Sequence, residues 1–498
     1  MPAESWFCLA TEFALRLNFK TKNRTSSCQL RFGIEHIFPA ESNPLALITD
    51  RRVICRSREM DQHLLKALQD LWIAAPRYRG GVFSTPELAK VIEACGPYTD
   101  GAAQYFGHQF AFLNALRSLG LPASTGGAVS PDNLEDVAAQ LIDACTCTHR
   151  MRIHYCPLDL ADDWPDLAFG EAVVRNFTPQ ELGVALDAQR LAAHHVTNGM
   201  DLHRLSMVKW LIVKETYSIE SSPGRRSSFF LDQFLEPDRG VLKPHENGWP
   251  RAVEDALFFL LLAPWEQWVS YPQSNIFGFE IPWVYTQDTD LFTSPVMPPN
   301  PDRLSIYPNI YLDPEGNEHE TDTPEQIHLH FNVAAQLARW DHAYWGKLEQ
   351  AKSTSLFETP IQHFLVRGFQ ANGIDEFLAH MTTIEAAVGT EADYGPGNRP
   401  YRRLKGAKRV AARLAGLLRT PDAAQQYEEL FHLRSVFLHG RAGIEPVSAT
   451  QRIRARSLAR RAAAELADRA ITLPLSRETL LDELLETGVP LAGYTATR

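Results

Sequence analysis

Nine prolines between residues 264 and 314 constrain the fold of this chain of 498 residues more than any other feature. Proline lacks a backbone N–H and interrupts helices and central strands, so this stretch predicts loops and short extended edges rather than long regular elements. The hydrophobic pattern before it differs from the pattern after it. We therefore expect an α+β protein with a mixed α/β region of unknown fold at 1–240, a Pro-rich junction at 241–325 and an all-α domain at 326–498.

The region before the prolines mixes strand and helix signals. Apolar residues alternate at residues 13–19 and again at 30–38, which is typical of half-buried strands. Helical patterns follow at 60–73, 87–94 and 133–144. The second of these begins with Thr85 as N-cap and Pro86 at the first helical position. A short strand is expected at 149–156.

Neither a membrane span nor a secretion signal is visible in the sequence. The longest apolar run, residues 256–265, has ten residues and is flanked by Asp255 and Glu266, whereas a span needs about 20, so it predicts a buried helix. Glu4 and Glu12 interrupt the N-terminus where a signal peptide would be apolar. The seven cysteines are odd in number and lie in the first third of the chain, which indicates a reducing compartment. We expect a cytoplasmic protein without a membrane partner.

Charge is distributed unevenly along the chain. The net charge is −11, yet residues 401–461 contain fourteen basic and four acidic side chains. Arg452, Arg456 and Arg460 follow each other at intervals of four and therefore share one helix face. A basic face of this kind is typical of a site for the phosphate backbone of RNA, and its alternative is a solvated Ala/Arg-rich helix.

Two charged residues interrupt apolar helical stripes in the last third of the chain. Glu385 interrupts the stripe formed by Ile374, Phe377, Leu378, Met381 and Val388. Arg434 interrupts the stripe formed by Tyr427, Leu430, Phe431 and Leu438. An unpaired buried charge costs several kcal/mol, so we expect the two to meet or to face a wet cleft. A purely structural ion pair is the alternative.

His439 follows five residues after Arg434 and precedes Gly440, a helix-ending residue. The dipole at a helix C-terminus favours a protonated imidazole, which suits His439 to accept and donate protons near neutral pH. The guanidinium of Arg434 is a permanently charged fork suited to phosphate oxygens. The pattern thus places a residue suited to proton transfer close in sequence to a residue suited to phosphate.

The segment Arg434, Ser435 and then His439 and Gly440 resembles the R-polar-x(3–5)-H motif of the HEPN superfamily, whose helical domains include metal-independent ribonucleases. Together with the residues around Glu385, the Arg409-Val410-Ala411 stretch and Arg441, it is similar to the ApeA-type HEPN domains of bacterial antiphage defence. The resemblance covers about residues 365–471. It implies a helical bundle, an RNA endonuclease acting in abortive infection, and an N-terminal region that senses a phage-derived trigger.

Catalysis is assigned to Arg434, His439, Ser435 and Glu385, and RNA binding to Arg441, Arg452, Arg456 and Arg460. One Arg/His pair supplies too few groups for phosphodiester cleavage, so we expect a homodimer through the C-terminal domain with a composite site, as the resemblance also implies. The alternatives are a non-catalytic helical module that binds RNA or protein, and a dimerisation device with structural charges.

No cofactor is expected from the sequence. Walker, dinucleotide-binding, nucleophile-elbow and H-E-x-x-H motifs are absent from the sequence. Five soft ligands cluster within twelve residues, namely Cys145, Cys147, His149, His154 and Cys156. Their spacing is not that of a zinc finger, and a strand there would point His149 and His154 to opposite faces, so we expect a packed strand and no metal.

Overall fold

The chain divides into two units, Met1–Ile54 and Cys55–Arg498, and every described residue belongs to the second unit. The strands expected at residues 13–19 and 30–38 lie outside the described residues. The structure, a computed structural model, describes residues 62–78, 81–99, 107–122, 133–195, 199–219, 222–227, 248–271, 276–330, 332–393, 401, 403–438, 446–472 and 476–495. These residues combine helices with two antiparallel sheets, in agreement with the expected α+β class.

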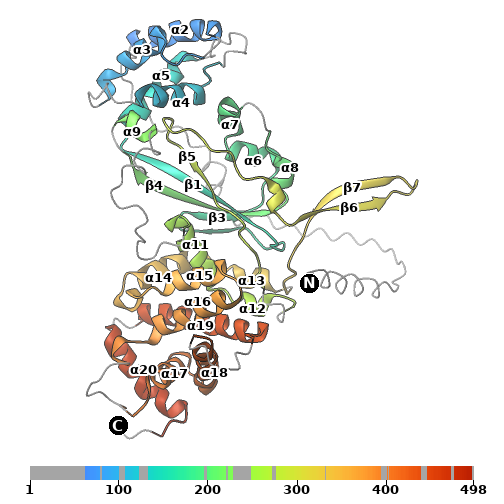
Figure 1. Ribbon diagram of the computed structural model, residues 1–498, viewed down its shortest axis with the longest axis vertical. Coiled ribbons are helices and arrows are strands. Elements are labelled where there is room, and N and C mark those ends of the chain that lie inside the picture. Colours follow the sequence, from blue (N-terminus) through green and yellow to red (C-terminus); the bar gives the residue numbers. More distant parts are fainter. Residues whose placement is uncertain are drawn as a thin grey trace, which may run out of the picture. The chain divides into compact units, whose positions relative to one another are not determined.

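The first described elements form a helical cluster, shown in blue and teal in Figure 1. It consists of α2 (Gln62–Ala74), α3 (Pro86–Ala94), α4 (His108–Ser118) and α5 (Leu134–Thr146). Thr85 accepts a hydrogen bond from the Leu88 backbone N–H at 3.3 Å and Pro86 opens α3, which confirms the predicted cap. The apolar faces of the helices share one core, which Phe292 completes from the Pro-rich stretch.

A five-stranded antiparallel sheet follows, with the strand order β2-β3-β4-β1-β5. Its strands are β1 (His149–Leu158), β2 (Leu167–Phe169), β3 (Ala172–Arg175), β4 (Lys209–Ser218) and β5 (Tyr285–Asp288). The strand β1 confirms the one expected at 149–156, and it pairs with β4 from His149↔Ser218 to Leu158↔Lys209. The fifth strand comes from the Pro-rich stretch and has only four residues, as the prolines predict.

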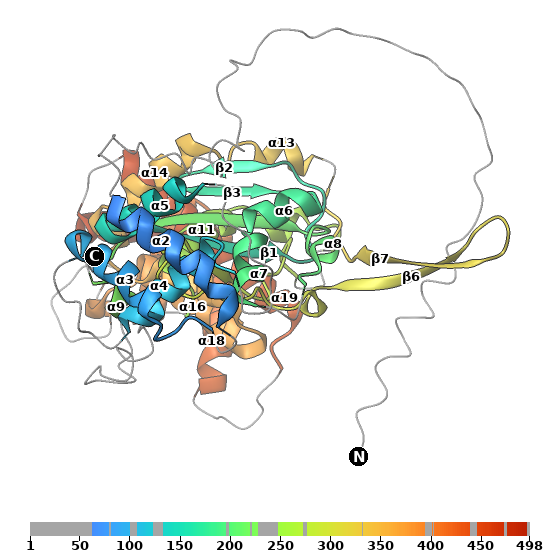
Figure 2. The same cartoon turned by 90° about the horizontal axis from the view of Figure 1, so that it is seen from above.

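Alternation along β1 and β4 gives the sheet two different buried faces. Tyr155 and Trp210 belong to a core with α6 (Pro179–Ala185) and α8 (Leu202–Leu205), and α7 (Ala188–His194) follows α6 in the chain. Cys156 and Leu211, one residue further along each strand, face the opposite core. Figure 2 shows the strands of the sheet together with helices α6, α7, α8 and α11.

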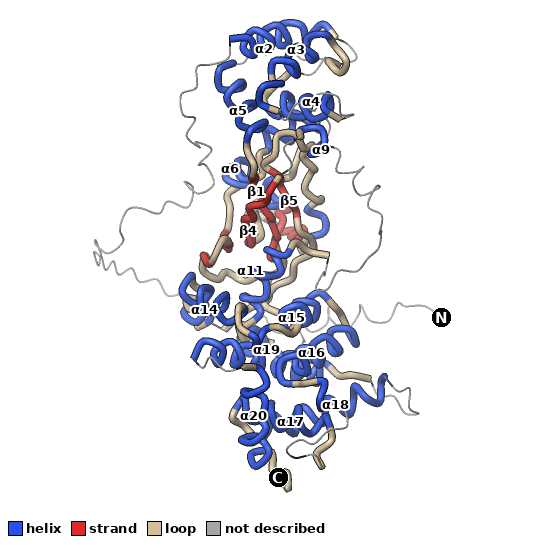
Figure 3. Tube along the Cα trace, turned by 90° about the vertical axis from the view of Figure 1, so that its left-hand side faces the viewer, coloured by secondary structure: helices blue, strands red, loops and turns tan. Residues whose placement is uncertain are grey.

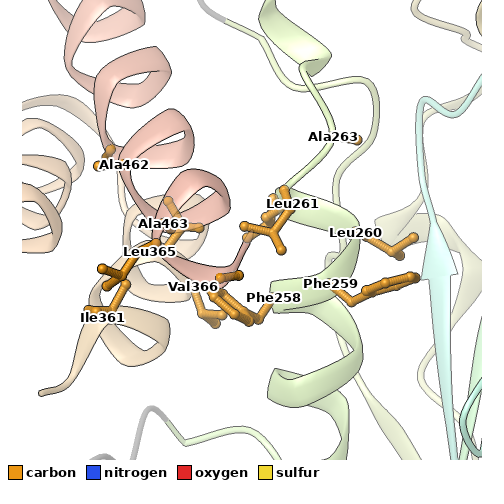
Figure 4. Packing of buried hydrophobic residues seen from close by; sticks show 14 of the residues in the cluster. Phe258, Phe259, Leu260, Leu261, Ala263, Ile361, Leu365, Val366, Ala462 and Ala463 are labelled. Carbon is orange, nitrogen blue, oxygen red and sulfur yellow. The ribbon is translucent and has the colours of Figure 1, made fainter. Parts of the chain in front are cut away.

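Helix α11 (Arg251–Leu261) links the sheet to the C-terminal helices. Its side chains pack against Leu365 and Val366 of α15 (Ile361–Gln370) and against Ala463 of α19 (Ala449–Thr472), as Figure 4 shows. The buried helix expected at 256–265 is therefore present, but it ends at Leu261, and Pro264 caps the short α12 (Trp265–Trp268). One continuous core crosses the expected boundaries at 240/241 and 325/326, which both lie inside the second unit.

From Val333 onward all described regular elements are helical (Figure 3). Besides α15 and α19 they are α13 (Val333–Leu337), α14 (His342–Lys352), α16 (Gly373–Val388), α17 (Gly406–Leu418), α18 (Pro421–Leu438) and α20 (Arg477–Leu491). Helices α17 and α20 cross closely because Gly416 and Gly488 lie at the contact, where a Cβ would collide with the backbone of the other helix.

The strands β6 (Ile306–Leu312) and β7 (Glu318–Pro324) form a separate two-stranded hairpin. The remaining short helix, α9 (Pro223–Ser227), contacts α4. Within the described residues, no helix is both long enough and apolar enough to cross a bilayer.

Candidate functional site

The two charges that interrupt the apolar stripes meet in the structure. Arg434 Nη1 on α18 lies 3.2 Å from Glu385 Oε1 on α16, which confirms the expectation that the two side chains pair. Neither side chain is fully enclosed, because 26% of the Arg434 side chain and 20% of the Glu385 side chain remain exposed. The site is thus an ion pair at a surface between two helices rather than a charge locked in the core.

Aromatic residues of α18 support this pair. The hydroxyl of Tyr427 donates a hydrogen bond to Glu385 Oε1 at 3.3 Å, and the tyrosine is completely buried. The ring of Phe431 lies one turn further along, and the Arg434 guanidinium stands over it at 5.8 Å. Residues 427, 431 and 434 share one helix face, which explains why they meet. The sequence indicated Tyr427 as an apolar core residue and did not reveal the role of its hydroxyl.

The environment of Glu385 raises its pKa above the ordinary value. Burial is the main cause, and the charge of Arg434 and the hydrogen bond from Tyr427 offset only part of it. Glu385, which accepts the hydrogen bond from Tyr427, keeps the guanidinium of Arg434 oriented, while part of the arginine side chain stays exposed. Because the arginine side chain stays partly exposed, an anion such as phosphate can approach it from solvent.

The end of α18 carries the rest of the expected site. Ser435 follows Arg434 on the helix and is partly exposed. The description of α18 ends at Leu438, so His439 and Arg441 lie outside the described residues. Leu438 is 50% exposed, so its interpretation as a core residue was wrong. The stripe stops contributing to the core after Phe431 because the last turn of the helix has no described element packed over it.

The RNA-binding face expected on α19 is mostly buried. Arg456 is 3% exposed and Arg460 8% exposed, which contradicts a role for either as a guide for RNA at the surface. Arg460 Nη2 pairs with Glu266 Oε1 at 2.7 Å, and the guanidinium of Arg456 covers the ring of Phe277 at 4.2 Å. Spacing by four residues correctly placed the arginines on one face of α19, but that face is turned toward acidic partners from distant parts of the chain.

Arg452, at the other end of this row, is the most accessible of the three. Its Nη1 lies 3.0 Å from Oε2 of Glu376, a buried carboxylate on α16, and a quarter of its side chain remains exposed. Arg456 Nη1 approaches the other oxygen of the same carboxylate at 3.9 Å. Arg452 and Arg456 therefore fasten α19 to α16, Arg460 fastens it to α12, and only Arg452 retains substantial access to solvent.

A second arginine cluster, which the sequence did not reveal, lies at the start of α17. Asp393 accepts hydrogen bonds from Arg409 Nε at 2.8 Å and from Arg413 Nη1 at 2.6 Å. All three side chains are buried. Although burial raises the pKa of Asp393, the two arginines outweigh that effect and hold it below its usual value. The signal was two arginines four residues apart in an otherwise apolar helix.

An open pocket of about 690 Å³ borders Glu385. Its lining residues include four carboxylates and one arginine, Glu358, Glu385, Glu391, Glu478 and Arg477. The guanidinium of Arg477 is engaged with backbone carbonyls, including that of Ala386 near the end of α16 at 2.6 Å. A pocket of this charge repels anions such as phosphate.

Three of the soft ligands near β1 are packed in the interior, namely Cys145, His154 and Cys156, whereas His149 is exposed. His154 is buried, with Nδ1 2.9 Å from Thr286 Oγ1 and Nε2 3.2 Å from Glu215 Oε2, and burial lowers its pKa. Cys145 and Cys156 are buried. Within the described residues, no group of three or more His, Cys, Asp or Glu side chains is arranged to hold a metal ion.

Comparison with known proteins leaves the site to be interpreted from its own residues. No family model, no curated protein and no solved structure matches the chain. Function therefore has to be inferred from the pairing of Glu385 with Arg434 and from the residues that follow on α18.

Proposed function

We propose that the protein is a metal-independent RNA endonuclease of HEPN type, acting as a regulated effector in antiphage defence in the cytoplasm. The observation that carries the proposal is the partly exposed ion pair between Glu385 on α16 and Arg434 on α18, inside an all-helical region. It supports the identification of the Arg434–His439 motif, because it holds the arginine in a fixed, partly exposed position five residues before the histidine in the sequence.

The reaction is an attack of the ribose 2′-hydroxyl on the adjacent phosphorus. His439 takes the proton of the 2′-hydroxyl and later protonates the 5′-oxygen as the P–O5′ bond breaks, which leaves a 2′,3′-cyclic phosphate and a 5′-hydroxyl. Arg434 stabilises the charge that develops on the phosphorane, and Ser435 orients the phosphate. No step requires a metal or a cofactor. Single-stranded or looped RNA fits best because its 2′-hydroxyl reaches in-line geometry.

A homodimer supplies the second set of groups. Phe437 and Leu438 are exposed in the turn of α18 that follows Arg434 and Ser435, and large apolar side chains beside a site are typical of an interface. In the proposed dimer these residues of two copies meet, and two Arg434–His439 pairs face one strand of RNA. A phage-derived trigger sensed by the N-terminal region would control this arrangement.

The test is incubation of the purified protein with total RNA in the presence of EDTA. We expect fragments that end in cyclic phosphate from the wild type and none from His439→Ala, with both proteins equally folded by circular dichroism. Equal cleavage by the variant, or cleavage abolished by EDTA, would contradict the proposal.

The second candidate is a non-catalytic helical module that binds RNA or protein. The burial of Arg456 and Arg460 and the acidic pocket beside Glu385 favour the protein-binding form of this module, because both reduce the basic surface available to RNA. This candidate predicts salt-sensitive binding and intact RNA in the same assay.

A further inference from the structure

The hairpin β6–β7 has a face whose two rows of side chains differ sharply in character. In the register of the hairpin, Ile310 lies opposite Glu320 and Leu312 lies opposite Glu318. Opposite residues of an antiparallel pair point to the same face, so an apolar row on β6 runs beside an acidic row on β7. Pro308 and Asp322 continue the two rows.

Both rows are open to solvent except at Asp322, which is partly buried and lies 3.4 Å from Arg204. Ile310 and Leu312 are each 65% exposed, and Glu318 and Glu320 are exposed as well. Of the described residues of the hairpin, only Ile306 at its base belongs to an apolar core. A two-stranded sheet is marginally stable alone and normally needs a further strand or a helix against its apolar face. The face therefore lacks the layer that would cover it.

The hairpin is nonetheless held firmly at both ends. At its base, the backbone N–H and the hydroxyl of Ser305 donate to the buried carboxylate of Asp159. At its tip, Asp313 accepts hydrogen bonds from Asn317 and pairs with His319 at 2.8 Å, which lower the pKa of Asp313 to about 2. A preorganised face loses little conformational entropy when a partner binds.

Charge decides what kind of partner fits. Residues 306–325 contain six carboxylates and neither lysine nor arginine. This charge repels the phosphates of RNA and the surface of anionic membranes. It favours a protein segment with basic side chains. Pro308 has no N–H to offer an added strand, so a helix across the face fits better than a strand at the edge of β6.

We propose that this face, formed by Pro308, Ile310 and Leu312 beside Glu318, Glu320 and Asp322, binds an amphipathic helix of a partner protein. The apolar stripe of that helix covers the β6 row, and lysines or arginines along its border pair with Glu318 and Glu320 of the β7 row. The interaction is independent of RNA cleavage, because it uses no residue of the site on α16 and α18.

The experiment measures binding of the full-length protein to a labelled synthetic helical peptide of leucine and lysine by fluorescence anisotropy. A peptide with glutamate in place of lysine is the charge control. We expect the Leu/Lys peptide to bind the wild type and the double variant Ile310→Thr/Leu312→Thr to bind it at least about tenfold more weakly. Glu318→Gln/Glu320→Gln should weaken binding and reduce its dependence on salt.

The matched control is Tyr307→Thr/Asn309→Thr, which changes two exposed residues of β6 on the opposite face and should leave the affinity unchanged. Equal affinity of the wild type and the Ile310→Thr/Leu312→Thr variant would overturn the proposal, as would equal binding of the Leu/Glu peptide. It would also be overturned if the wild type ignored the peptide and sedimented as an oligomer that Ile310→Thr/Leu312→Thr dissociates, since the occupant would then be a second copy.

Discussion

Two carboxylate–arginine clusters of the helical region differ in how completely they are satisfied. Asp393 is fully enclosed and receives hydrogen bonds from two buried arginines. Glu385 faces one arginine, and both members of that pair keep contact with solvent. Their pKa values move in opposite directions, down for Asp393 and up for Glu385.

The difference separates a structural ion cluster from a site able to exchange partners. Where every donor and acceptor is used, as around Asp393, a ligand has nothing to bind. Where a guanidinium is held by a single carboxylate and both side chains keep contact with solvent, a phosphate can compete for the guanidinium at smaller cost. We therefore expect substitutions at Asp393 to affect mainly stability and substitutions at the Glu385–Arg434 pair to affect mainly activity.

The largest effect is expected from Asp393→Asn. Removing the charge leaves Arg409 and Arg413 buried without their counter-ion, which should destabilise the protein by about 3–5 kcal/mol. Because the native pKa of Asp393 is lowered, its contribution is complete above the unfolded value of 3.8 and disappears as the pH falls through the native value. Denaturant unfolding measures the loss, with the exposed Asp422→Asn as control. A change below about 1 kcal/mol would contradict the structural role.

Arg434→Ala should have little effect on stability and a large effect on RNA cleavage. The pair with Glu385 is partly exposed, so the loss in unfolding free energy should be about 1 kcal/mol or less. Loss of the charge that stabilises the phosphorane should slow RNA cleavage by roughly 10²- to 10³-fold. Unfolding and single-turnover cleavage, measured on the same preparation, separate the two effects. If the variant loses several kcal/mol of unfolding free energy but its folded form cleaves RNA at the wild-type rate, Arg434 has a structural role like that of Arg409 and Arg413.

Glu385→Gln should have a smaller effect on activity and a distinct effect on pH dependence. An amide still hydrogen-bonds but holds the guanidinium less firmly, so cleavage should slow by about tenfold. The native pKa of Glu385 lies above the ordinary 4.5, so native protein binds this proton more tightly than unfolded protein. Wild-type stability should therefore fall as pH rises from 4.5 through the native value, and this decrease should be missing in the variant.

Unfolding curves of the two proteins across that pH range provide the measurement. Identical pH profiles would show that Glu385 is not perturbed by burial. Full cleavage by Glu385→Gln, under conditions where Arg434→Ala is inactive, would show that the carboxylate does not orient the arginine.

The smallest effect is expected from Arg454→Ala. Arg454 lies 3.6 Å from Glu429, and about half of each side chain is exposed, so the pair should contribute less than about 0.5 kcal/mol. This variant is the control for both clusters in thermal unfolding. A loss as large as that of Asp393→Asn would mean that exposure does not distinguish the clusters.

Local patterns in the sequence predicted the parts of the fold and site that depend on neighbouring residues. Thr85 and Pro86 predicted the start of α3, because the hydrogen bond of an N-cap forms within its own helix. Glu385 and Arg434 could be paired because each interrupted an apolar stripe, and a charge in such a place needs a partner.

Prediction from the sequence failed where the partner of a side chain comes from a distant part of the chain. Arg460 looked like a surface residue of a basic helix, but it binds Glu266, which is 194 residues away. The hydroxyl of Tyr427 and the role of Asp393 were missed for a similar reason, since only the packing of separate segments brings their partners to them. Periodicity shows which residues share a helix face, but it does not show which other segments pack against that face.

The pairing of β1 with β5 also has a consequence for synthesis of the chain on the ribosome. Arg152 of β1 meets Asp288 of β5, and the two are 136 residues apart. At typical elongation rates this interval takes on the order of ten seconds, during which one edge of β1 has no neighbour. Until β5 emerges, that edge is open to pairing with other nascent chains. The separation of 136 residues between Arg152 and Asp288 therefore delays the pairing that completes this edge of the sheet.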